Sequence, residues 1–152
     1  MRLQRYMGID YGEKRVGLAL ADDEKMLAIP HRVFKMSEDL AADLEHLAAI
    51  VKGEADVVVL GLPLTTEGTE GPMAKTVREF AQEIQFRTDL PVHFQDERFS
   101  SRENVGLLTG IPKEQRLLVQ DALAAAGILQ TWLDRKKALQ ARASRESVEH
   151  KE

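Results

Sequence analysis

The chain of 152 residues has no cysteine, few aromatic residues and no long apolar run. Without cysteine there is no disulfide framework, thiolate zinc site or cysteine nucleophile, so any catalysis must use oxygen, imidazole or metal chemistry. No window approaches the roughly 18 apolar residues that a membrane span requires. The first residues are too polar for a secretory signal. We therefore expect one domain of a soluble, cytoplasmic protein with no membrane partner.

The first third of the chain has the pattern of three short strands joined by tight turns, over residues 5–10, 15–21 and 29–34. A helix should follow, with Ser37 as its N-cap and an apolar stripe from Leu40 to Val51. Residues 57–60 are a continuous β-branched and leucine run, which is typical of a strand buried on both faces.

The rest of the chain alternates between helical and extended patterns, with turn residues between them. The predicted elements are a helix that begins at Pro72 with a stripe from Met73 to Ile84, a strand over 91–95, a helix over 100–109, and a last helix with a stripe from Leu118 to Trp132.

This order of elements predicts an α/β three-layer domain that resembles ribonuclease H. The mixed five-stranded sheet should contain an antiparallel three-stranded meander, followed by right-handed crossovers that place helices on both faces. We place the domain at residues 1–137. Residues 138–152 have almost no apolar face and should form a polar C-terminal extension, either helical or disordered.

Three acids occupy positions where the predicted elements can bring them together. Asp10 ends the first strand, Glu97 follows the last strand, and Asp121 lies beside the apolar stripe of the final helix. Carboxylates without cysteine or paired histidine favour Mg²⁺ or Mn²⁺, and shared acids can hold two such ions for phosphodiester hydrolysis. A cluster of this kind should raise the pKa of at least one of its carboxyl groups in the metal-free protein.

Each acid also has a simpler interpretation. Asp10 can initiate the turn at Gly12, Glu97 can form a surface ion pair with a nearby arginine, and Asp121 can form a structural salt bridge with Arg98. Asp96, next to Glu97, either joins the cluster or caps the following helix.

The net charge of -4 argues against nucleic-acid binding through bulk charge alone. Residues 134–152 nevertheless hold six cations and four anions, so the negative charge belongs to the body of the protein. Divalent ions at the acid cluster would offset much of it. His93 is expected to pack rather than act as a base. No aromatic stacking platform is visible, so recognition of nucleic acid should depend on shape and phosphate contacts.

Four motifs resemble the YqgF or RuvX-like family of small bacterial nucleases, and together they span residues 7 to about 133. They are GIDYGEKRVGLA at 8–19, VLGLPL at 59–64 with EGTE at 67–70, DERFSS at 96–101, and DALAAA at 121–126.

The resemblance implies a ribonuclease H-like fold and a metal-dependent nuclease site in which Asp10, Glu97 and Asp121 correspond to the family's acids. Family members often carry lysines and a valine just before the last acid, whereas residues 116–120 here read RLLVQ. This difference removes a basic phosphate contact for which Lys113 and Arg116 are candidate substitutes. Further candidate phosphate or substrate contacts are Lys14, Arg15 and Arg98.

The leading hypothesis is a metal-dependent endonuclease that acts on structured nucleic acid. Family naming favours the 5′ end of pre-16S rRNA as substrate. The alternative is a Holliday junction resolvase, which acts on branched DNA and would require a two-fold homodimer in order to cut two strands symmetrically. Two further classes rank lower. A non-catalytic RNA-binding module is disfavoured because all three acids are present. An actin-like ATPase is disfavoured because it needs two copies of the fold and 152 residues hold only one.

Overall fold

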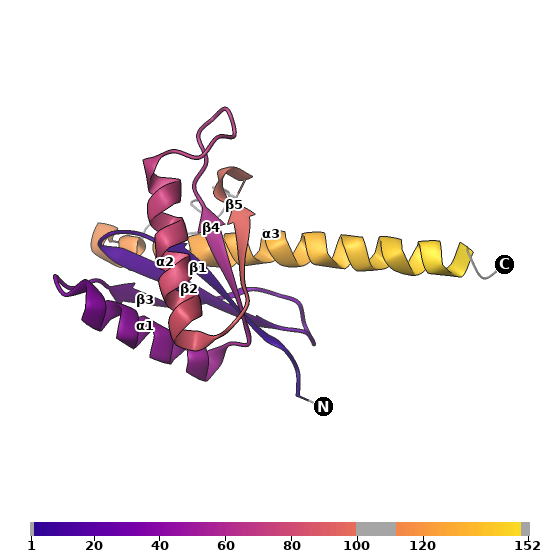
Figure 1. Ribbon diagram of the computed structural model, residues 1–152, viewed down its shortest axis with the longest axis horizontal. Helices are drawn as coiled ribbons and strands as arrows, with labels where there is room; N and C mark the ends of the chain where they lie inside the picture. The colour runs from indigo at the N-terminus through magenta and orange to yellow at the C-terminus, as the bar shows by residue number, and fades with distance from the viewer. Residues whose placement is uncertain (1, 100–111, 150–152) are drawn as a thin grey trace.

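A computed structural model describes residues 2–99 and 112–149 and shows one five-stranded mixed sheet with helices on both faces (Figure 1). The strand order across the sheet is β3-β2-β1-β4-β5. The elements are β1 (Arg5–Tyr11), β2 (Arg15–Asp22), β3 (Ile29–Lys35), α1 (Leu40–Glu54), β4 (Val57–Leu62), α2 (Pro72–Thr88), β5 (Val92–Asp96), the 3-10 turn η1 (Glu97–Phe99) and α3 (Lys113–Glu149).

The sheet combines two kinds of strand pairing. β1, β2 and β3 form the predicted antiparallel meander, and β4 and β5 continue the sheet parallel to β1. The carboxyl ends of β1, β4 and β5 therefore meet at the same edge. This confirms the predicted fold class. The predicted helix over 100–109 lies outside the described residues.

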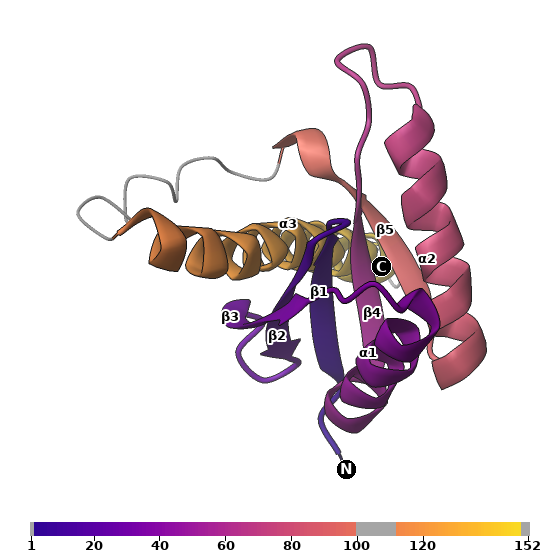
Figure 2. The same ribbon diagram turned by 90° about the vertical axis from the view of Figure 1, so that its left-hand side faces the viewer.

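Two apolar cores lie on opposite faces of the sheet. Figure 2 shows the helices that cover these two faces. Helices α1 and α2 pack against one face, where Leu47 and Ile84 belong to the core, and α3 crosses the other face, where it contributes Ala125 and Leu129. Every residue of β4 is buried, as the unbroken apolar run at 57–60 predicts. β4 is therefore an interior strand of the sheet, between β1 and β5.

The start of α1 differs from the prediction. Asp39, not Ser37, is the N-cap, and its side chain accepts a hydrogen bond from the backbone N–H of Ala42. Ser37 instead donates its N–H and hydroxyl to the buried carboxylate of Asp43, at 2.8 Å each. Both Ser and Asp are good N-caps, and the buried acid on the first turn engages the serine.

The predicted apolar stripes are buried except at their first residues and at Trp132, which is half-buried. Leu40, Met73 and Leu118 are exposed because each lies in the first turns of its helix, before the helix reaches the sheet.

α3 is much longer than the sheet that it covers. It continues as a helix to Glu149, and its last turns extend past the sheet (Figure 1). From residue 137 onward its described side chains are all exposed. In the described ranges 2–99 and 112–149, no helix has the length and apolar character needed to cross a membrane.

Candidate active site

Asp10 lies between two glycines at the edge where the parallel strands end. It pairs with Gly17 of β2, and because Ile9 pairs with Leu60 of β4, the next residue along β4 beside Asp10 is Gly61. Glycines within strands often mark places where another chain segment approaches closely. Both glycines flanking Asp10 have this role.

Glu97 reaches Asp10 over Gly61. It is the first residue after β5, and its Oε1 lies 2.9 Å from the position that a Cβ on Gly61 would occupy. The Glu97 and Asp10 side chains are hydrogen-bonded to each other. Two carboxyl groups can share such a bond only if one of them carries a proton.

Asp121 approaches from α3, which lies directly on Gly17. A Cβ on Gly17 would lie 1.9 Å from the carbonyl oxygen of Asp121, so only glycine permits this contact. The helix also lies close to Gly8, where a Cβ would be 2.6 Å from the carbonyl oxygen of Ala125. Small residues on both surfaces thus set the height of Asp121 above the sheet.

Arg15 holds the carboxylate of Asp121. Its Nε donates to Asp121 Oδ2 at 2.6 Å. Both side chains are largely buried, with exposed fractions of 25% for Asp121 and 33% for Arg15. The predicted salt bridge of Asp121 therefore exists, but its partner is Arg15 and not Arg98. In this conformation, no set of three histidine or acidic side chains among the described residues is arranged as a metal site.

The environment of Asp10 favours its neutral form. Burial raises its pKa most, and the hydrogen bond and negative charge of Glu97 and the charge of Asp121 raise it further. The expectation of a raised carboxyl pKa is confirmed. A half-buried group of acids that repel one another has the electrostatic character of a cation site before the cation binds.

Asp96 caps the short turn η1, whereas the predicted helix over 100–109 lies outside the described residues. Asp96 accepts the backbone N–H of Arg98 at 2.9 Å and forms an ion pair with the Arg98 guanidinium, with 2.7 Å between Oδ2 and Nη2. This bond lowers the pKa of Asp96. Arg98 Nη1 also donates to the carbonyl of Thr66, in the loop after β4, at 3.4 Å. Arg98 therefore links η1 to that loop, beside Glu97.

The other predicted cations lie at the rim. Lys14 in the β1–β2 turn, and Lys113 and Arg116 in the first turns of α3, are exposed, and their proposed phosphate contacts stay predictions. Sequence reasoning missed two features: the glycines beneath the acids and the bond from Arg15 to Asp121. Glycine inside a predicted strand is the local signal for the first, whereas no local signal announces the second.

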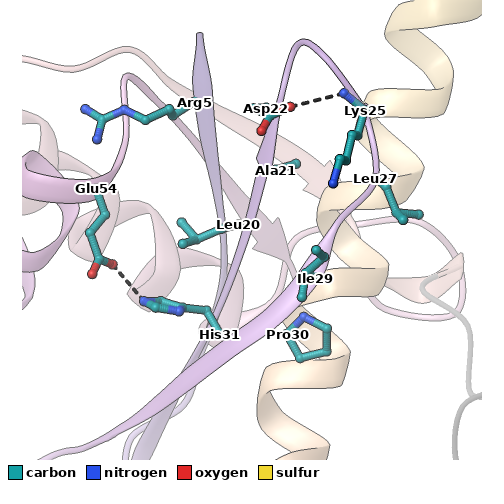
Figure 3. Close-up of a pocket in the computed structure, with 10 residues that line it drawn as sticks. All are labelled: Arg5, Leu20, Ala21, Asp22, Lys25, Leu27, Ile29, Pro30, His31 and Glu54. Atoms are coloured by element: carbon teal, nitrogen blue, oxygen red, sulfur yellow. Dashed lines mark hydrogen bonds and ion pairs between the residues drawn. The ribbon is translucent and has the colours of Figure 1, made fainter. Parts of the chain in front are cut away.

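A pocket of about 330 Å³ at the opposite end of the strands lacks the chemistry of this site (Figure 3). Its two acids are already engaged. Asp22 accepts backbone N–H groups of Glu24 and Lys25, and Glu54 pairs with His31 at 2.9 Å. The cluster of Asp10, Glu97 and Asp121 is therefore the candidate active site.

Comparison with solved structures agrees with the fold. The fowlpox virus resolvase, solved with its Holliday junction DNA, aligns with a TM-score of 0.55 at 13% identity, over 87% of this chain and 98% of that chain. RuvC of T. thermophilus, solved with a Holliday junction substrate, aligns with a TM-score of 0.50 at 16% identity, over 88% and 96%. These similarities show the ribonuclease H-like fold shared with resolvases.

Sequence relatives are much more similar. Proteins provisionally named pre-16S rRNA nuclease are 39% identical in Endomicrobium trichonymphae, over 87% of this chain and 96% of the relative, and 42% identical in Anaeromyxobacter sp. (strain Fw109-5), over 88% and 99%. A family profile described as RuvX, Holliday junction resolvase, matches residues 4–135, which include all three acids. The chain belongs to the RuvX family.

Proposed function

We propose that this protein is a divalent-metal-dependent endonuclease that hydrolyses phosphodiester bonds at the 5′ end of pre-16S rRNA. One observation carries the proposal: Asp10, Glu97 and Asp121 converge on a glycine-lined part of the sheet, with Asp10 hydrogen-bonded to Glu97 and its pKa raised by both other acids. The relatives that align with this chain over nearly their whole length are named for this activity.

The donor set suits Mg²⁺ or Mn²⁺. All three side chains offer hard carboxylate oxygens, and repulsion among them is relieved by a cation. Asp10, Glu97 and Asp121 would hold the metal after Asp10 loses its proton and Arg15 turns away from Asp121. Bound divalent ions would activate the attacking water and stabilise the departing 3′ oxygen.

The remaining residues of the site have roles in binding and orientation. Arg15, once released from Asp121, would lie beside the cluster as a guanidinium able to contact a phosphate in two places. Asp96 orients Arg98, so that the guanidinium and the loop after β4 are held together near Glu97. Lys14, Lys113 and Arg116 would contact phosphates at the rim.

A second candidate function is resolution of Holliday junctions, which the family description favours. That activity would require a two-fold homodimer with paired sites. Parallel cleavage of a 5′-extended rRNA fragment and a DNA four-way junction, with Mg²⁺ and with Mn²⁺, separates the two functions. We expect a defined cut in the rRNA fragment, whereas symmetric cuts in the junction alone would assign the protein to DNA.

The same assay tests the site. Glu97→Gln should abolish cleavage, whereas Glu79→Gln, an exposed glutamate on α2 across the sheet, should leave it intact. Cleavage of neither substrate by the wild-type protein with either metal would refute the proposed function.

A further inference from the structure

A groove of about 560 Å³ runs between β5 and the part of α3 that leaves the sheet. Its volume is within the range of ligand sites. We call it the β5–α3 groove, and its principal lining residues are His93, Phe94, Trp132, Arg135, Lys136 and Leu139. The proposed catalysis does not use any of them.

Stacked rings form one wall of the groove. The rings of His93 and Trp132 lie 5.2 Å apart between centroids and are tilted by 36°. Tyr6 supports Trp132 from within the core, at 5.7 Å, and Lys136 donates to the Tyr6 hydroxyl at 2.7 Å. Trp132 is therefore held in place, while His93 is exposed. A fixed aromatic pair with one exposed ring can stack an unpaired base at little conformational cost.

The charge of the groove is opposite to that of the protein. The chain has a net charge of -4, yet the groove is lined by Arg135 and Lys136 and by no acid among the described residues. Arg135 is exposed, and Lys136 Nζ lies 5.5 Å from the centroid of the Trp132 ring. Cations beside stacked rings complement a strand that carries both bases and phosphates.

The groove and the candidate active site share the same two elements. His93 of β5 precedes Glu97, the first residue after that strand, by four residues, or about 13 Å of nearly extended chain. On α3, Trp132 follows Asp121 by eleven residues, or about 16 Å of helix. A nucleic-acid strand at the acids would reach the groove within a few nucleotides.

We propose that the β5–α3 groove binds an unpaired segment of the RNA substrate beside the cleavage position, with a base stacked on His93 and phosphates held by Arg135 and Lys136. The proposal rests on the proposed function, because it takes the strand in the groove to be the one cut at the acids. It assigns a recognition role to residues from two separate elements, neither of which shows a base-stacking motif in sequence.

Trp132 is the only tryptophan of the chain, so its fluorescence reports on the groove alone. We would titrate single-stranded oligouridine of about ten nucleotides into full-length Asp10→Asn protein in EDTA, where no cleavage occurs. Saturable quenching of Trp132 is expected. Combining His93→Ala with Arg135→Glu should weaken binding about tenfold or more, because a stacked base and a phosphate contact are both lost.

Arg145→Glu is the matched control. It makes the same charge change on the same helix, at an exposed residue outside the groove, and should leave the affinity within about twofold. Melting temperatures of all variants check that they fold. Absence of saturable quenching, or equal affinity in the wild-type groove and the groove variant, would overturn the proposal.

Two further outcomes are distinct. A dimer that dissociates on Leu139→Glu, with Trp132 emission insensitive to RNA, would assign the groove to a second copy of the chain and overturn the proposal. Cleavage tested separately with Mg²⁺ distinguishes the two hypotheses. Normal cleavage by the groove variant would refute only the role of the groove in binding the substrate. RNA binding that depends on the groove, without any cleavage by the wild-type protein, would refute the nuclease function and support the groove as an RNA-binding site.

Discussion

Replacing Gly17 by alanine should disturb the active site without touching any acid. The added Cβ would lie 1.9 Å from the carbonyl oxygen of Asp121 and 2.4 Å from its carbonyl carbon. Ordinary contacts begin at 3.4 Å, so α3 would have to move away from β2 by about 1.5 Å. Because both neighbours are backbone, no side-chain rotation can relieve the contact.

Two consequences follow from a shift of this size. Overpacking in a close-packed interior costs about 1 to 3 kcal/mol, which lowers the melting temperature by several degrees. A displacement of about 1 Å at a catalytic group reduces the rate about 100-fold. We therefore expect Gly17→Ala to remain folded and to cleave RNA about 100-fold more slowly than the wild-type protein.

Gly53→Ala is the matched control. Gly53 lies exposed near the end of α1, and a Cβ there would have no neighbour within 4 Å. Alanine in a helix is favoured over glycine by about 0.5 to 1 kcal/mol, so this variant should melt at the same or a higher temperature and cleave normally. Thermal denaturation and single-turnover cleavage test both variants. Wild-type stability and rate in Gly17→Ala would refute the close approach of α3.

Three further predictions concern charged groups. Asp10→Asn should stabilise the metal-free protein at pH 7 by up to about 4 kcal/mol, because a carboxyl whose pKa is raised on folding destabilises the folded state increasingly above its ordinary pKa. Melting experiments in EDTA should show this gain in stability at pH 7 and not near pH 3. A lower melting temperature of the variant at pH 7 would contradict the prediction. Asp56→Asn should lower the melting temperature at pH 7, since the hydrogen bonds from Arg5 lower the pKa of Asp56 to about 2. The stabilisation by the charged carboxylate is present above the ordinary pKa of aspartate and is lost as the pH falls towards 2. A difference in melting temperature between the variant and the wild-type protein that is independent of pH would count against this prediction. Arg15→Gln should bind Mn²⁺ alone about two- to fivefold more tightly by calorimetry, because Arg15 competes for Asp121, and weaker binding would refute that competition.

Much of the fold follows from local patterns. The uninterrupted run at 57–60 predicts the buried interior strand β4, and Pro72 predicts the first residue of α2. The meander follows from short strands and tight turns. These features depend on neighbouring residues, which is why they can be identified without knowledge of tertiary contacts.

The candidate site was predictable only in part. Asp10 and Glu97 stand out because they end strands, and Asp121 because it lies beside an apolar stripe. Their spacing above the sheet depends on Gly17 and Gly61, whose importance appears only when α3 and η1 are placed over them. Contacts between distant segments decide this geometry, and no local pattern encodes them.

The surface features were the least predictable. His93 and Trp132 are far apart in the chain, and only the packing of α3 against β5 brings their rings together. The helical extension beyond residue 137 was one of two alternatives. Its alanine, arginine and glutamate content favours a helix even without an apolar face.

The central claim is that three carboxylates and divalent metal perform the cleavage. The most direct measurement is single-turnover cleavage of a 5′-extended 16S rRNA fragment by the wild-type protein and Asp10→Asn, each with Mg²⁺ and with EDTA, together with the RNA affinity of both proteins. We predict cleavage only by the wild-type protein with Mg²⁺, a loss of about 1,000-fold or more in Asp10→Asn, and equal RNA affinity. Cleavage by the wild-type protein in EDTA, or by Asp10→Asn at the wild-type rate, would contradict the account.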